Sequence, residues 1–306
     1  MYDGATTWSA GRIPRGVPVL AAFTAGAAAL AAFSPAPLAI ISVFLFAGPH
    51  NWMEARYLAA RMPARWGRQR AFFQVAIAGV AALGPTFSLI AVNRSLWHTA
   101  AACWVLLLVR MARHKAYSGA LPAAFFWMAG AWIAPGLADL TLVFLHPLAA
   151  LWFAKRQIAR SRPEWLPGFS AIAAAIIPLG LVVVLRAPTA AAGRDWATLN
   201  LGFSPIPGAP ALVALHAFLE LLHYGAWAIL LPSIGMASAP WDVRNIPLAR
   251  GVNGSRFVPV FFGTAAAAVV LLWLCFLLDY RTTYDVYFSL AIVHVLAELP
   301  FLVRLR

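Results

Sequence analysis

Ten long apolar segments limit how this chain can fold more than any other feature of its sequence. Most of them are long enough to cross a hydrocarbon core about 30 Å thick. Apolar residues make up 62% of the 306 residues and charged residues 11%, which is outside the usual balance of a soluble domain. The sequence therefore predicts an all-α, polytopic membrane protein with about ten transmembrane helices in a single domain, 1–306. The segments are 16–34, 36–58, 71–93, 95–113, 118–134, 135–154, 168–187, 208–232, 258–279 and 284–303.

The basic residues predict how these segments are oriented. With ten crossings, 19 of the 23 lysines and arginines fall on one side, and only Arg94, Arg186, Arg194 and Arg281 fall on the other. The positive-inside rule then places both termini in the cytoplasm, and in a bacterium the protein would lie in the inner membrane. The formal charge of +13 follows from this topology. Because the charges are spread over all the cytoplasmic loops, we expect no nucleic-acid partner. Only Pro135-Gly136 separates the fifth and sixth segments, so whether both cross the membrane is left open.

Ionisable side chains recur within the apolar segments at helical spacing. His216, Glu220 and His223 follow one another at i, i+4 and i+7, which places them on one face of the eighth segment. The spacing of Glu220 and His223, i and i+3, is also the one by which helical bundles hold di-iron carboxylate centres. This face therefore predicts half of a metal site.

Three further segments supply candidates for the other half. The second carries His50 and Glu54 four residues apart, the tenth carries His294 and Glu298 at the same spacing, and the sixth carries His146. These four segments all run from outside to cytoplasm, and their polar residues lie roughly 8 to 18 residues from the outer ends. Unpaired ionisable groups at such depth cost a few kcal/mol each, so they need mutual partners or a cation.

The types of ligand indicate which cation. Five imidazoles and three carboxylates without a thiolate favour non-haem iron, with manganese or zinc as alternatives. Eight ligands exceed the needs of one ion, so the sequence predicts two ions bridged by carboxylates. A buried polar network that holds four helices in register is the structural alternative. The predicted ligands are His50, Glu54, His146, His216, Glu220, His223, His294 and Glu298.

Other polar residues receive lesser roles. We expect Asn51, Tyr57, Tyr224 and Asp139 to orient the imidazoles. Tyr57 or Tyr224 would also assist proton movement, and Asp139, nearer the outer surface, would lie on the access path. The remaining histidines, His98 and His114, are expected to be solvated or interfacial. Two isolated cysteines, Cys103 and Cys275, are expected only to pack.

Short motifs at these positions resemble those of a known family. Gly48-Pro49-His50-x-x-x-Glu54 is similar to the Pro-His-Gly-x-x-Asp box of the Brp/Blh family, membrane proteins that cleave β-carotene to retinal with iron and dioxygen. Phe144-x-His146 resembles that family's Phe-x-His element, His223-Tyr224-Gly225 its His-Phe-Gly element, and His294 with Glu298 its final Pro-His followed by an acid. Here the acids are Glu, the His-Tyr-Gly element follows His146, and the expected spans are more numerous. The resemblance implies oxidative cleavage at an iron centre.

The predicted function is therefore dioxygen chemistry at two buried iron ions on a lipophilic substrate that enters from the bilayer. The reaction would be oxidative cleavage, hydroxylation or desaturation, with membrane lipids as surroundings and an electron donor as a possible partner. Three alternatives stay open. They are a membrane-embedded zinc hydrolase, a proton or metal transporter, and a b-type haem protein that uses His146 with His294 or His216 as axial ligands.

Overall fold

The structure is a computed structural model that describes residues 16–62, 66–88, 93–112, 117–187, 209–235, 246 and 254–304. Within these ranges the regular structure is helical and no strand occurs, which confirms the all-α class. The lead before residue 16, His114 and most of the loops at 188–208 and 236–253 lie outside the described residues.

The described helices follow the predicted apolar segments closely. One long rod is built from α9, a π-helical turn η3 and α10, and short 3-10 turns precede α3 and α7. The helices are α1 (Gly16–Phe33), α2 (Pro35–Arg61), α3 (Arg70–Ser88), α4 (Arg94–Met111), α5 (Tyr117–Ile133), α6 (Pro135–Ser161), α7 (Leu166–Arg186), α9 (Ala209–Gly225), η3 (Ala226–Leu230), α10 (Leu231–Gly235), α11 (Gly254–Leu278) and α12 (Tyr280–Arg304).

Length and apolar composition suit a membrane for seven of the described helices, namely α1, α2, α3, α6, α7, the α9–α10 rod and α11. Large apolar side chains cover the outside of the molecule. Ile133, Ile177 and Leu278, for example, are 80–86% exposed. Lipid is the solvent in which such a surface is stable. The protein is therefore described as an integral membrane protein, while the count of ten crossings and the cytoplasmic side of the termini stay predictions.

The fifth and sixth segments form separate helices. Ala134 leaves the helical conformation, with φ −147° and ψ 76°, and Pro135 begins α6. Proline suits this position because it lacks the N–H that a first helical turn cannot satisfy. α5 has 17 residues and α6 has 27, so the break makes two rods of unequal length.

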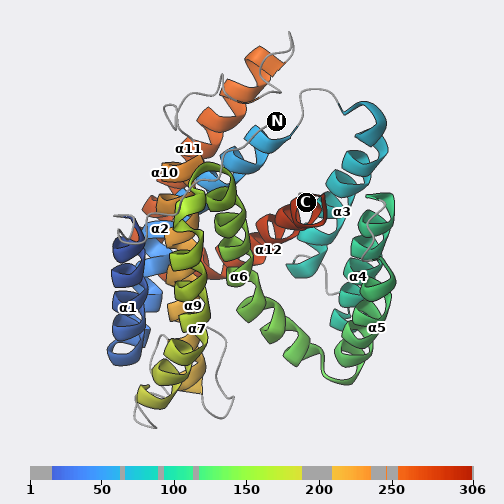
Figure 1. The fold of residues 1–306 in the computed structure, drawn as a ribbon. Helices are drawn as coiled ribbons and strands as arrows, with labels where there is room; N and C mark the ends of the chain where they lie inside the picture. Colours follow the sequence, from blue (N-terminus) through green and yellow to red (C-terminus); the bar gives the residue numbers. More distant parts are fainter. Residues whose placement is uncertain are drawn as a thin grey trace, which may run out of the picture.

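The α9–α10 rod lies at the centre of the fold. α9 contacts α1, α2, α6 and α7, and most residues of the stretch Pro210–Ile234 are buried. Figure 1 shows α3, α4 and α5 as a group on one side of α6 and α12, with α1, α7 and α9 on the other. α12 packs on α3 and α4 as well as on α2, α6 and α11.

Candidate metal centre

Six ionisable side chains converge where α2, α6, α9 and α12 meet. Each was predicted as a metal ligand, and the four helices are the ones expected to supply them. They form two groups that share one member. The first group is His50, Glu54, His223 and His294, and the second is His146, His223 and Glu298.

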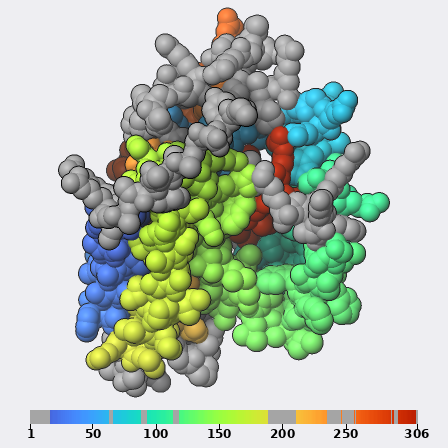
Figure 2. All heavy atoms as spheres, viewed as in Figure 1, coloured from blue at the N-terminus to red at the C-terminus, as the bar shows by residue number. Residues whose placement is uncertain are grey.

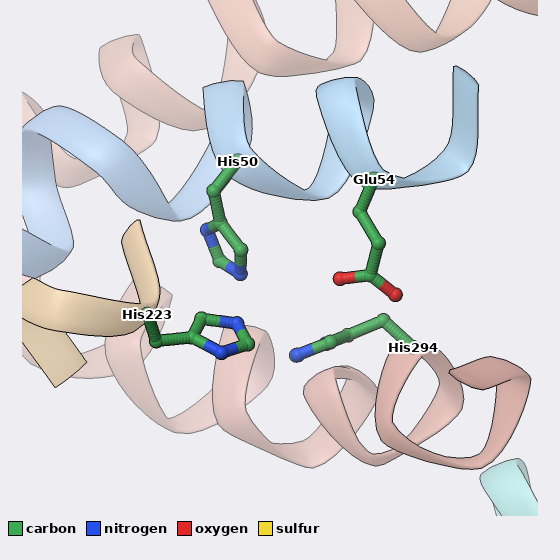
Figure 3. Close-up of side chains that lie close together, drawn as sticks. All are labelled: His50, Glu54, His223 and His294. Carbon is green, nitrogen blue, oxygen red and sulfur yellow. The ribbon is translucent and has the colours of Figure 1, made fainter. Parts of the chain in front are cut away.

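The atoms in each group are close enough to serve one ion. One nitrogen or oxygen from each residue lies within 4.8 Å of those from the others. Ligands bonded at about 2.0–2.2 Å lie at most about 4.4 Å apart, so small side-chain movements would complete either set. Figure 3 shows His50 and Glu54 on α2 pointing toward His223 and His294 across a common space.

His50 is held by its own helix. It follows Pro49 within α2, and its Nδ1 atom lies 2.8 Å from the carbonyl oxygen of Phe46. Because a carbonyl can only accept, Nδ1 is the protonated nitrogen and Nε2 carries the lone pair. Glu54 stands one turn further along the same face, and both side chains are 1% exposed. A backbone hydrogen bond of this kind is the usual way in which a metal-ligating histidine is oriented.

α6 and α12 bring His146, His294 and Glu298 together, which links the two groups. The Nε2 atoms of His146 and His294 lie 3.0 Å apart, and Nδ1 of His146 lies 3.4 Å from Oε2 of Glu298. The other oxygen of Glu298 accepts a hydrogen bond of 3.1 Å from the indole N–H of Trp227, which belongs to η3. Contacts between helices thus fix both the carboxylate and the imidazole pair.

The residues present fit a metal centre by an independent test. Within the described part of the chain, Nε2 of His50, Oε2 of Glu54 and both ring nitrogens of His223 are buried without a hydrogen-bond partner. Each such buried polar atom costs roughly 1–3 kcal/mol when it is left unsatisfied. The atoms that could bind a metal are all imidazole nitrogens and carboxylate oxygens. The two thiols, Cys103 and Cys275, lie on α4 and α11, which supply no residue to either group. This set suits iron, manganese or zinc.

The other two predicted ligands, His216 and Glu220, lie beside the six and belong to neither group. Nδ1 of His216 is 3.7 Å from a Glu220 oxygen, and the other oxygen of Glu220 accepts a hydrogen bond of 2.6 Å from the Tyr224 hydroxyl. The ring of Tyr224 packs against His50 with centroids 4.5 Å apart. Tyr224 therefore joins this polar pair to the imidazoles, and its positioning role stays a prediction.

Asp139 and His98 form a pair near the N-terminal end of α6. His98 lies 1% exposed, and its Nε2 is 2.9 Å from Asp139. The expectation that His98 is solvated is therefore wrong, while an interfacial position stays a prediction. The sequence shows neither the α4–α6 contact nor the two tryptophan rings, Trp97 and Trp127, that enclose the imidazole.

Tyr57 and Asn51 take other partners than those expected. The hydroxyl of Tyr57 donates to Gln157 at 3.2 Å, and its ring packs on Trp227. The amide nitrogen of Asn51 donates to the Ala47 carbonyl and to the Tyr287 hydroxyl. Neither side chain is recorded as hydrogen bonding a cluster histidine within the described residues. The ring of Tyr57 contacts the site through Trp227, whose indole donates to Glu298.

Trp227 and Tyr287 are the residues that sequence reasoning missed. Trp227 follows His223 by four residues, so its helical spacing was a usable signal. The π-helical turn that carries it was not predictable from that spacing, and such turns are frequent at functional sites. Tyr287 lines the cavity beside the histidines. It precedes His294 by seven residues, so its helical spacing was also a usable signal.

Comparisons with known protein families, with characterised proteins and with solved structures found no match for this chain.

Proposed function

We propose that the protein is a membrane-embedded enzyme that holds two non-haem iron ions and uses dioxygen to oxidise a lipophilic substrate. The observation that carries this proposal is the pair of overlapping ligand groups that share His223. A network that served only to join helices would satisfy its own hydrogen bonds. This cluster instead leaves buried nitrogen and oxygen atoms of His50, Glu54 and His223 without partners in the described residues.

The chain's own residues have distinct tasks in this proposal. Imidazoles of His50, His223 and His294 would supply nitrogen ligands, and His223 would have to lose its ring proton to serve both ions, since a neutral imidazole has one nitrogen lone pair. Glu54 and Glu298 would offset the charge of two cations. The Phe46 carbonyl and the Trp227 indole hold His50 and Glu298 in place. Two bound iron ions would supply the activation of dioxygen.

A cavity of about 210 Å³ supports the choice of a lipophilic substrate. Imidazoles of His50, His146, His223 and His294 line one part of it, and side chains from α3, α6 and α12 form an apolar wall. Figure 2 shows the surface hollowed between α6 and the side formed by α3, α4 and α5, with α12 visible inside. An apolar molecule dissolved in the bilayer would reach the histidines by this side. The apolar wall consists of Phe87, Leu142, Val143, Ile292 and Val295.

The metal content of protein purified without chelator tests the proposal. We expect two iron ions per chain and a Mössbauer spectrum of a magnetically coupled pair. One zinc ion per chain would instead indicate a hydrolase, and a Soret band would indicate haem. Protein that binds no metal and keeps its fold would show that the cluster is a structural network. Metal flux into liposomes without dioxygen consumption would indicate a transporter.

A further inference from the structure

The cavity beside the histidines has a second polar end. Asp139 lines it together with His146, and both belong to α6. Seven residues separate them, which corresponds to two helical turns and about 10 Å along the helix axis. The apolar side chains of Leu142 and Val143 line the cavity in between. A molecule that fills this space meets the imidazoles together with Glu220, Tyr224 and Tyr287 at one end and the Asp139 carboxylate at the other.

The carboxylate end is a rigidly built arrangement. His98, 1% exposed, is enclosed by the rings of Trp97 and Trp127, with centroid distances of 5.1 and 5.5 Å. Its Nε2 donates to one oxygen of Asp139 at 2.9 Å. Nε of Arg94 lies 3.8 Å from the other oxygen. These partners from α4 fix where the carboxylate points.

Asp139 retains the capacity to accept more hydrogen bonds. Its side chain is 30% exposed, and an ionised carboxylate offers about four acceptor positions. A pure hydrocarbon in the cavity would cover this charge without replacing the water that solvates it, which is costly. A ligand with a hydroxyl group would supply the missing donor, and a ligand with its own carboxylate would be repelled.

We propose that the cavity binds a long-chain alcohol whose hydroxyl donates to Asp139 and whose apolar chain lies against the histidines. The inference rests on the proposed function, since the distance of about 10 Å would then select the carbon that is oxidised. His98 and Arg94 act as positioning residues, because they hold Asp139 and do not touch the chain. The ligand class is thus an amphiphile with a hydrogen-bond donor at one end.

Photolabelling in nanodiscs tests this inference without requiring turnover. The probes are 1-decanol, decane and decanoic acid, each carrying a diazirine in mid-chain, and labelled residues are located by mass spectrometry. We expect the alcohol to label the cavity wall, Leu142 to Val143 and Ile292 to Val295, about tenfold more than either other probe. That factor corresponds to one hydrogen bond to a charged group.

Two variants make the outcome specific. Asp139→Ala should reduce labelling by the alcohol to the level of decane, and Asp139→Asn, which keeps the shape and one acceptor, should give an intermediate level. The control is Thr141→Val on the same helix, because Thr141 is exposed and bonds only its own backbone at Leu137. Equal labelling by all probes in the unmodified protein, or an alcohol preference that survives in Asp139→Ala, would overturn the inference.

Metal analysis of the same samples separates this inference from the proposed function. Labelling is measured on protein as purified and after treatment with chelator. An alcohol preference in a protein that never binds iron would support alcohol binding in the cavity and contradict the proposed iron enzyme. Two irons per chain without any alcohol preference would support the iron centre and contradict alcohol binding. Unchanged metal content in Asp139→Ala is expected, since Asp139 belongs to neither ligand group.

Discussion

Nε2 of His146 on α6 and Nε2 of His294 on α12 lie 3.0 Å apart, although 148 residues separate them in the chain. Two neutral imidazoles at this distance either share one hydrogen bond or direct their lone pairs at cations, and here they belong to the two different ligand groups. The neighbouring Glu298, 3.4 Å from the other nitrogen of His146, supplies a negative charge that suits the cation. This pair is therefore the most direct place to test the metal centre.

Replacing either imidazole should remove metal. We expect His146→Ala and His294→Ala each to lower the bound metal by at least one ion per chain, because each removes a nitrogen ligand. Elemental analysis of purified protein measures this, with His98→Ala as the control, since His98 belongs to neither ligand group. Full metal retention in both variants would mean that the short contact is only an imidazole–imidazole hydrogen bond.

Two histidines of α9 offer a matched comparison. His223 belongs to both ligand groups and His216 to neither, so His223→Ala should lose both ions whereas His216→Ala should retain them. The hypothesis of eight ligands, drawn from the sequence, instead expects similar losses in the two variants. Metal content and thermal stability measured together would separate ligand loss from misfolding. Equal losses of metal in two stable variants would restore His216 to the ligand set.

The indole of Trp227 is expected to tune the site through Glu298. Trp227→Phe removes the N–H that donates to this carboxylate at 3.1 Å, which should lower metal affinity about tenfold or more. Loss of a hydrogen bond to a buried charge should also destabilise the protein by about 1.5–3 kcal/mol. Competition with a chelator measures the affinity.

Trp104→Phe is the control for this substitution. The indole of Trp104 donates to the Val75 carbonyl at 3.0 Å, away from the cluster. The Trp104→Phe substitution should therefore lower the stability of the protein and leave its metal affinity unchanged. Equal affinities in the two variants would contradict the role given to Trp227.

Gly225 is expected to permit the close packing of α1 on the central rod. A Cβ atom at this position would lie 2.5 Å from the ring of Phe23, so Gly225→Ala should destabilise the protein by about 1–3 kcal/mol. Phe23→Leu should restore part of that loss. Gly263→Ala is the control, since nothing lies within 4 Å of a Cβ there, and thermal unfolding in nanodiscs measures all three. No difference between the two alanine variants would show that α1 adapts freely.

The sequence by itself determined the helical class and the positions of the helices. Long apolar runs have few alternatives in lipid, because backbone polar groups must be satisfied within each segment. It also determined which pairs share a helix face, since His50 and Glu54, or His294 and Glu298, are local neighbours at i and i+4. The sequence also predicted that these polar residues share one site, because ionisable groups within membrane-spanning segments are costly unless they find partners or a cation.

Only the tertiary structure decided which of those residues meet. Seven residues on α9 separate His216 from His223, so the two side chains start about 10 Å apart along the axis. Which of them reaches His50 depends on how α9 packs against α2, and the structure joins His50 to His223. The Trp227 to Glu298 bond and the His98 to Asp139 pair also cross between helices. Periodicity describes one helix at a time, whereas rotation and depth of one helix against another are set by packing.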